Sequence, residues 1–290
     1  MPRRNVFRAA FLVAALAAAE APGQPASPSP QESVVSSEPE SSEPVSAERL
    51  AELYQSRSVT VAPPDEDAGT PLRLPYRLLA PARPLPGRRY PLVLFLHGAG
   101  ERGDDNRAQL AYLPAWLAEP DAREAFPCYV LAPQCRAGKK WVEVDWSASR
   151  STPQRPAPSP DLLGAIAALE ETLAREAVDP DRIYLTGLSM GGYGAWDMAA
   201  RMPDRFAALL PVCGGADEAT AAKLVGLPVW CFHGDADTAV PVGLSRAMIE
   251  ALRIAGGDPR YSELAGVGHD AWTPAYRDRA VLEWLFEQRR

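Results

Sequence analysis

The run Arg182-Ile-Tyr-Leu-Thr-Gly-Leu-Ser-Met-Gly-Gly192 decides the fold of this chain. Its first five residues are typical of a buried strand, and a helical pattern begins at Met190, directly after Ser189. Gly-x-Ser-x-Gly at such a junction indicates a sharp turn, because only glycine lets the chain reverse so tightly around the serine. Chance produces the five-residue pattern in roughly one chain in ten of this length. The case for a functional Ser189 therefore rests on the residues around it.

Strand-like and helix-like segments alternate on both sides of this turn, which is typical of an α/β sheet. Continuous apolar runs among them predict strands that are buried on both faces. We expect strands over residues 73–80, 91–96, 128–132, 182–186, 206–213, 228–232 and 260–264, and helices over 161–177, 190–200, 242–256 and 280–288. Asp161 is predicted to cap the first of these helices. The pattern predicts a single domain over residues 70–290, with a mostly parallel, doubly wound sheet flanked by helices.

Residues 1–19 have the pattern of a secretory signal peptide. Arg3, Arg4 and Arg8 precede a short apolar run over 9–19, which ends in alanines suited to cleavage. This run is too short for an ordinary membrane span, and no later segment is apolar enough to be one. We therefore expect a secreted or periplasmic protein, with an uncleaved N-terminal anchor as the alternative.

Three further segments lie outside the predicted sheet and its flanking helices. Residues 20–46 are rich in Pro, Ser and Glu and predict a disordered linker, because they offer too little apolar surface to offset ordering. A helical pattern over 47–56 predicts a lead-in helix, followed by a connection that ends at residue 69. Residues 133–160 are irregular, and loops of this length inside a domain are often functional.

Charge and cysteine content narrow the function classes. The 290 residues carry a formal net charge of -7 and no cluster of Lys or Arg after the first few residues, so no nucleic-acid partner is expected. Export would permit disulfides, but a domain of this size does not need them, so we expect mostly free, buried thiols. The cysteines are Cys128, Cys135, Cys213 and Cys231. No Cys-x-x-Cys or His-rich spacing is present, so neither a metal nor another cofactor is predicted. The oligomeric state is left open.

A serine hydroxyl needs a base to act as a nucleophile. The chain has three histidines, His97, His233 and His269. In hydrolases with this serine turn the chain order is nucleophile, then acid, then histidine, and His269 alone follows both the serine and a plausible acid. The acid fixes the imidazole tautomer and stabilises its cation. Asp237 is the preferred acid, Asp235 is the second choice and Asp217 a distant third.

A tetrahedral intermediate needs backbone N–H groups arranged to hold its oxyanion. One donor is expected from Met190, directly after the nucleophile, and the other from the loop His97-Gly-Ala-Gly100, where Ala99 is favoured over Gly100. His97 and His233 are interpreted as structural residues that bond loop backbone. A local ion pair between Glu101 and Arg102 is a further way to hold this loop.

These motifs together resemble the α/β-hydrolase superfamily. The resemblance rests on four segments, His97-Gly-Ala-Gly-Glu-Arg-Gly103, Gly187-Leu-Ser-Met-Gly-Gly192, His233-Gly-Asp-Ala-Asp237 with Val240-Pro241, and Gly268-His269. Within the superfamily the chain resembles secreted carboxylesterases of the feruloyl-esterase and polyhydroxybutyrate-depolymerase type, and also predicted peptidases of the prolyl-oligopeptidase kind. The resemblance covers about residues 70–290 and implies Ser189, Asp237 and His269 as the triad, with Ala99 and Met190 as the oxyanion donors. A serine in the turn disfavours the cysteine chemistry of dienelactone hydrolases and the aspartate nucleophile of dehalogenases.

Three functions remain open at this point. The first is a secreted carboxylesterase acting on a small-molecule or carbohydrate-linked ester. The second is a serine peptidase, and the third is a non-catalytic binding protein on a hydrolase scaffold. Trp141, Trp146 and Trp272 are candidates to stack on an aromatic acyl group or a sugar, of which Trp141 and Trp272 are the chosen substrate-binding residues.

Overall fold

A computed structural model describes residues 45–62 and 71–290. The predicted signal peptide, the predicted linker up to residue 44 and the end of the predicted connection (63–70) lie outside these residues. Within the described ranges, none of the helices is both long and apolar enough to cross a membrane.

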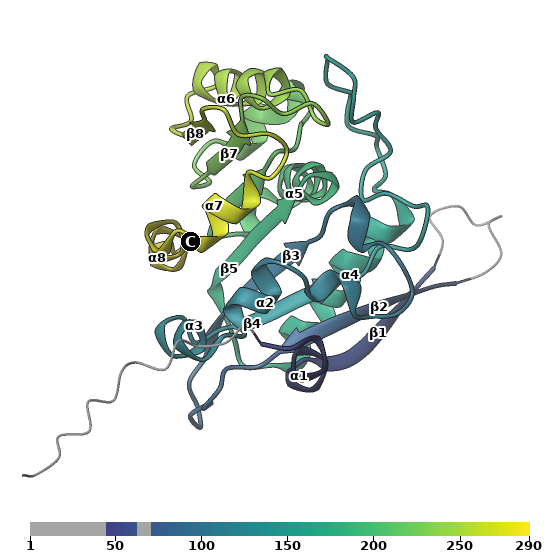
Figure 1. Ribbon diagram of the computed structural model, residues 1–290, viewed down its shortest axis with the longest axis vertical. Helices are drawn as coiled ribbons and strands as arrows, with labels where there is room; N and C mark the ends of the chain where they lie inside the picture. The colour runs from purple at the N-terminus through teal and green to yellow at the C-terminus, as the bar shows by residue number, and fades with distance from the viewer. Residues whose placement is uncertain (1–44, 63–70) are drawn as a thin grey trace, which may run out of the picture. The chain divides into compact units, whose positions relative to one another are not determined.

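The strands of these residues form one sheet of eight, in the order β1-β2-β4-β3-β5-β6-β7-β8 (Figure 1). They are β1 (Gln55–Val61), β2 (Leu72–Leu79), β3 (Tyr90–Leu96), β4 (Tyr129–Pro133), β5 (Val178–Leu188), β6 (Ala208–Val212), β7 (Trp230–Gly234) and β8 (Arg260–Leu264). The six strands from β4 to β8 in this order pair in parallel, whereas β1 and β2 extend one edge through antiparallel pairings. The expected mostly parallel sheet is confirmed, with strand bounds shifted by a few residues.

Helices pack on both faces of the sheet, as the doubly wound pattern requires. One face is covered by α4 (Pro160–Arg175), α5 (Met190–Arg201) and α6 (Gly243–Ile254). The other face is covered by α1 (Ala47–Leu53), α2 (Leu113–Leu117), α7 (Trp272–Arg277) and α8 (Arg279–Glu287). The remaining helical segments are short, namely α3 (Pro120–Ala125), η2 (Ala99–Glu101), η3 (Ala108–Leu110), η4 (Pro203–Arg205) and η5 (Glu218–Leu224).

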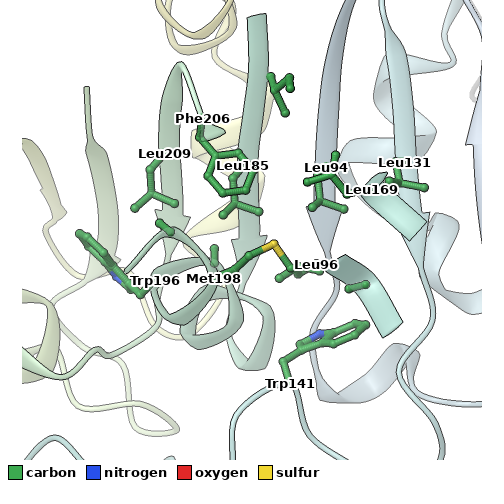
Figure 2. Close-up of a cluster of buried hydrophobic side chains, with 14 of the residues drawn as sticks. Leu94, Leu96, Leu131, Trp141, Leu169, Leu185, Trp196, Met198, Phe206 and Leu209 are labelled. Atoms are coloured by element: carbon green, nitrogen blue, oxygen red, sulfur yellow. The ribbon is translucent and has the colours of Figure 1, made fainter. Parts of the chain in front are cut away.

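Leucines of the central strands form the core between the sheet and α4 and α5 (Figure 2). Those on the strands are Leu94 and Leu96 of β3, Leu131 of β4 and Leu185 of β5, all fully buried. They pack with Leu169 of α4 and Met198 of α5. Every residue of β3 is buried, which confirms the two-sided burial expected for residues 91–96. Burial of one such leucine stabilises the fold by about 1.5–3 kcal/mol, so this cluster fixes the strand ends next to the serine turn.

The cap of α4 differs from the prediction. Ser159, not Asp161, is the N-cap, and its hydroxyl accepts the N–H of Leu162 at 3.1 Å. Proline is well suited to the first helical position, so Pro160 belongs to the helix and the cap moves one residue before it. Asp161 is instead a buried partner of Arg136, whose Nη2 donates to Asp161 Oδ2 at 2.8 Å.

The N-terminal end of the described chain also differs from the prediction. The expected helix over 47–56 ends at Leu53, and residues 55–61 form β1, which pairs along its whole length with β2. The sheet therefore begins before residue 70. The buried Arg77 of β2 holds this segment, because its guanidinium donates to the carbonyls of Ala51 and Tyr54 at 3.0 and 2.9 Å and to that of Asn106 at 2.6 Å. Ser-Val-Thr-Val61, with three β-branched residues and alternating polar and apolar side chains, was the available strand signal.

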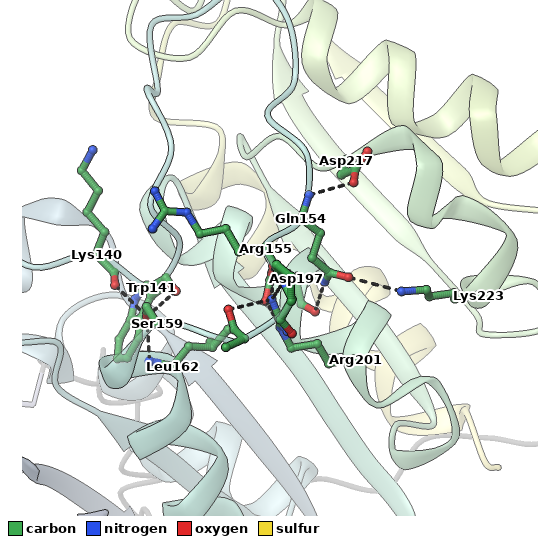
Figure 3. Close-up of polar contacts among 12 residues, drawn as sticks. Lys140, Trp141, Gln154, Arg155, Ser159, Leu162, Asp197, Arg201, Asp217 and Lys223 are labelled. Atoms are coloured by element: carbon green, nitrogen blue, oxygen red, sulfur yellow. Dashed lines mark hydrogen bonds and ion pairs between the residues drawn. The ribbon is translucent and has the colours of Figure 1, made fainter. Parts of the chain in front are cut away.

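The irregular stretch after β4 is tied to the helices by side-chain hydrogen bonds (Figure 3). Ser159 Oγ donates to the carbonyl of Trp141 at 2.7 Å, and the backbone N–H of Gln154 donates to Asp217 Oδ2 at 2.8 Å. The guanidinium of Arg201 on α5 donates to the carbonyl of Arg155 at 2.7 Å. These bonds give a loop without regular structure a fixed path over α5.

His97 fastens the loop that follows β3. Its Nε2 accepts the N–H of Cys135 at 2.9 Å, so the ring hydrogen lies on Nδ1, which donates to the carbonyl of Gly98 at 2.6 Å. Burial lowers the pKa of His97 from 6.5 to about 4. The structural interpretation of His97 is confirmed by these contacts, and the residue is a neutral imidazole at neutral pH.

We predict that Arg77→Ala lowers the free energy of unfolding by about 3 kcal/mol, because it leaves three carbonyls, two of them in buried hydrogen bonds, without their charged donor. Arg73→Ala on the same strand is the matched control, since Arg73 is exposed and bonds one hydroxyl, Ser58 Oγ. Its effect should stay within about 0.5 kcal/mol. Urea unfolding of both variants checks this, and equal effects would contradict the role given to Arg77.

We predict that His97 makes the fold sensitive to mild acid. Its pKa is about 4 in the folded chain and 6.5 when unfolded, so between these values the unfolded chain binds the extra proton. This contribution is complete above pH 6.5 and is lost as the pH falls toward 4, amounting to about 2 kcal/mol less stability at pH 5 than at pH 7. Urea unfolding at both pH values should show a smaller loss in His97→Gln than in the original chain. The same loss in both would refute the assignment.

Candidate active site

Ser189 lies on the turn that joins β5 to α5. Its backbone dihedrals, φ 53° and ψ −119°, are in a region that non-glycine residues rarely adopt. Glycines on both sides make this turn possible, because a Cβ on Gly187 would overlap the carbonyl of Gly191, and a Cβ on Gly191 would overlap the carbonyl of Leu96. The turn places the serine hydroxyl at the C-terminal ends of the strands, where α/β sheets bind ligands.

Three of the predicted residues come together at this point. His269 Nε2 lies 2.8 Å from Ser189 Oγ, and His269 Nδ1 lies 2.7 Å from Asp237 Oδ2. His269 follows β8 and Asp237 follows β7, so the two neighbouring strands deliver the histidine and the acid to one edge. The side chain of His269 is 28% exposed, whereas that of Asp237 is fully buried. The chain of hydrogen bonds from Ser189 through His269 to Asp237, called the hydrogen-bonded line below, therefore runs from the surface into the protein.

The carboxylate of Asp237 is buried but well bonded. Its Oδ1 accepts the backbone N–H groups of Ala239 and Val240 at 2.8 and 2.9 Å. Burial alone would raise the pKa of Asp237, but the hydrogen bonds from His269 and from these two backbone groups outweigh it, and the pKa is lowered. The acid thus stays ionised and can stabilise a positively charged imidazole.

His233 adds a contact that the sequence did not predict. Its Nε2 lies 3.0 Å from the carbonyl of Val240 and 3.2 Å from Asp237 Oδ2. Both atoms are acceptors, so Nε2 carries the hydrogen and Nδ1 accepts from Ser245 Oγ at 2.7 Å. Burial lowers the pKa of His233, so the ring is neutral at neutral pH. Its Nε2 hydrogen points toward the Asp237 carboxylate and helps to keep it in place. The bond to loop backbone agrees with the structural role expected for His233.

The other acids considered for this position have different partners. Asp235 Oδ1 accepts the N–H of Gly266 at 2.7 Å and so stabilises the loop that carries His269. Asp217 caps η5, where its Oδ1 accepts the N–H of Ala219 at 3.1 Å. The structure therefore brings Asp237, and neither of these, to the histidine.

The loop expected to hold an oxyanion lies beside the serine. A Cβ built on Gly98 would be 3.7 Å from Ser189 Cβ, so Ala99, the next residue, follows at close range. Met190 is the first residue of α5, and its N–H is one of those at the helix N-terminus without a partner inside the helix. Met190 therefore adjoins the serine in the chain, and the loop that carries Ala99 approaches it in space at Gly98.

The expected ion pair between Glu101 and Arg102 is absent among the described contacts. Arg102 instead donates from Nε to the carbonyl of Ala99 at 2.8 Å, and so braces the loop through its backbone. Burial raises the pKa of Glu101, whose Oε2 is shielded from solvent without a hydrogen-bond partner in the described chain.

The two predicted substrate-binding tryptophans have different positions. Trp141 is fully buried, and its Nε1 donates to the carbonyl of His97 at 3.0 Å, so it cannot touch a substrate and that prediction is wrong. The sequence alone does not show whether a tryptophan in a loop packs into the core or faces solvent. Trp272 begins α7, half-buried, with its ring perpendicular to His269 at 5.3 Å. Tyr112, which the sequence did not single out, packs edge-on against Trp272 at 5.5 Å and has a φ of 63°.

The four cysteines are free and buried, which confirms the expectation for the thiols. Cys213 lies directly after β6, close to Asp237 and His269. No local pattern predicts this proximity, because it depends on how β6 and β7 end side by side.

The chain is similar in sequence to several known proteins. The Dienelactone hydrolase family model matches residues 147–278. The putative esterase NocK of Nocardia uniformis subsp. tsuyamanensis is 33% identical over 190 residues, covering 64% of this chain and 52% of that protein. The poly(3-hydroxyalkanoate) depolymerase C of Paucimonas lemoignei is 29% identical over 132 residues, covering 43% of this chain and 28% of that protein.

One solved structure is also similar to this chain. The crystal structure of a thermostable esterase superposes with a TM-score of 0.73 at 37% identity, covering 83% of this chain and 64% of that chain. The chain spans about half the length of NocK and less than two thirds of the thermostable esterase. The fold, the serine turn and these likenesses confirm the resemblance found in the motifs: the chain has the α/β-hydrolase fold and is similar to esterases of that fold.

Proposed function

We propose that this protein is a serine carboxylesterase that cleaves its substrate through an acyl-serine intermediate. The observation that carries the proposal is the unbroken hydrogen-bonded line from Ser189 Oγ through both ring nitrogens of His269 to the buried Asp237, with links of 2.8 and 2.7 Å. Such a line supplies a nucleophile, a base and a charge that orients the base.

In the first step His269 Nε2 takes the hydroxyl proton while Ser189 Oγ attacks the ester carbonyl. The N–H groups of Met190 and Ala99 hold the oxyanion that forms. Asp237 keeps the ring hydrogen on Nδ1, so that Nε2 is free to act as the base. The alcohol leaves with the proton from His269, and a water molecule, activated in the same way, then releases the carboxylic acid and restores Ser189.

The proposed substrate is a small-molecule or carbohydrate-linked ester. The names of the relatives support an ester, since NocK is a putative esterase and the Paucimonas protein a poly(3-hydroxyalkanoate) depolymerase. Trp272 supports a flat substrate group, because its half-buried ring stands beside His269 with Tyr112 behind it. We also propose that the protein is exported, because the pattern over residues 1–19 predicts a signal peptide.

Two other functions were open from the sequence. A non-catalytic scaffold would gain nothing from the strained backbone of Ser189 or from a continuous bond line to a buried acid, so the geometry favours catalysis. A peptidase uses the same residues, so the choice between ester and amide must come from measured rates.

The proposal predicts that Ser189→Ala lowers ester turnover by at least about 10⁴-fold while the fold is retained, because the nucleophile is lost. Rates on a p-nitrophenyl ester and a p-nitroanilide with the same acyl group should favour the ester. A fluorophosphonate probe should label the original chain and leave the variant unlabelled. Near-normal hydrolysis by Ser189→Ala would overturn the proposal, and a preference for the anilide would favour the peptidase.

The two aspartates after β7 make a matched pair for testing the acid. Asp237→Asn should lower turnover by about 10³–10⁴-fold, because an amide no longer fixes the imidazole tautomer that accepts the serine proton. Asp235→Asn removes a charge but keeps an oxygen that can accept the N–H of Gly266, so its turnover should stay within about tenfold of the original. Steady-state rates with the same ester check both. The reverse order of effects would assign the acid to Asp235.

A further inference from the structure

Cys213 occupies a strained position next to the proposed triad. It follows β6 with a φ of 40°, a value that non-glycine residues rarely adopt, and its side chain is fully buried. Backbone strain of this kind persists only where the surrounding structure enforces it, and it is concentrated at functional sites. Here the strained residue presents a thiol.

Three different donor atoms converge at this position. Cys213 Sγ, a carboxylate oxygen of Asp237 and a ring nitrogen of His269 all lie within 4.8 Å of one another. In the part of the chain that the structure describes, this is the one group of three or more His, Cys, Asp or Glu side chains with ligand atoms so close together. The thiol of Cys231, equally buried, instead donates to Ser245 Oγ at 3.5 Å.

Thiolate, imidazole and carboxylate are the donors that Zn²⁺ takes in proteins, in tetrahedral geometry with bonds of about 2.0–2.3 Å. Such bonds place neighbouring ligand atoms roughly 3.3–3.6 Å apart. His269 Nδ1 and Asp237 Oδ2 are 2.7 Å apart, so they would need to separate slightly. The sulfur lies within 4.8 Å of the other donor atoms and would move inward by at most about 1.5 Å. Three protein ligands and a fourth open position are a common arrangement for this ion.

We propose that Cys213, Asp237 and His269 bind a thiophilic divalent cation, with Zn²⁺ as the expected ion, and that the bound cation inhibits the proposed hydrolase. The inhibitory part rests on the proposed function, since the cation occupies two members of the triad. The cation binding itself rests on the donor geometry alone.

The inhibition follows from the proton count of the imidazole. A cation on Nδ1 uses the lone pair of that nitrogen, so the single ring hydrogen moves to Nε2. Nε2 then donates toward Ser189 Oγ and cannot accept its proton. The thiol of Cys213 loses its proton to solvent when the sulfur–metal bond forms. Asp237 exchanges its bond with the ring N–H for a bond with the cation.

The first experiment measures binding without activity. Cd²⁺ is added to the metal-free, reduced full-length protein, and the ultraviolet absorption of the thiolate–cadmium bond is recorded. We expect this absorption in the original chain and in Cys231→Ala, the matched buried-thiol control, and its loss in Cys213→Ala. His269→Ala keeps the thiol and should bind Cd²⁺ more than about tenfold more weakly, since even loss of an outer-shell partner costs about 10–100-fold. This variant keeps the test decisive if Cys213→Ala does not fold.

The second experiment measures inhibition of ester hydrolysis by Zn²⁺, with each variant compared with its own metal-free rate and with reversal by a chelator. The half-inhibitory concentration should rise more than about tenfold in Cys213→Ala and remain unchanged in Cys231→Ala. Retention of the cadmium absorption in Cys213→Ala, or equal inhibition of all three proteins, would overturn the proposal. Cadmium absorption in a protein that hydrolyses no ester would leave the metal site standing and refute the proposed function instead.

Discussion

The close approach of α5 to the end of β3 is the constraint on which the rest of the site depends. Gly191, in the first turn of α5, lies so close to the carbonyl of Leu96 that no side chain fits between them. This contact brings the serine turn and the loop after β3 to the same place, because Leu96 is the last residue of β3. Gly98 and Ser189 become neighbours although they lie far apart in the chain.

The site also shows how a buried charge is kept ionised. Asp237 is surrounded by N–H donors from three directions, namely its own loop backbone, His233 and His269. A carboxylate that is bonded on every side cannot swing away from the histidine, so its position and its charge are fixed together. His233 takes part in this without being a titrating group at neutral pH, since burial keeps its ring neutral.

The sequence predicted those features that local pattern and chain order determine. The parallel strands were readable as apolar runs, and the residues of the hydrogen-bonded line followed from the glycines of the serine turn and from the order serine, acid, histidine. The edge strand β1 was missed because its residues are mostly polar and partly exposed, so its signal was weak. The burial of Trp141 and the positions of Tyr112, His233 and Cys213 depend on contacts between distant segments, which no local pattern encodes.

The fully buried Trp141 has a consequence for how this chain can change during evolution. Its indole is bonded to the backbone of His97 and seals one end of the long loop against the core, while residues further along, such as Glu143, Asp145 and Arg150, are exposed. The loop therefore combines buried and half-buried residues that pack on the core, such as Trp141 and Trp146, with exposed positions between them. Substitutions at these exposed positions can therefore accumulate during evolution while the buried contact between Trp141 and His97 is kept.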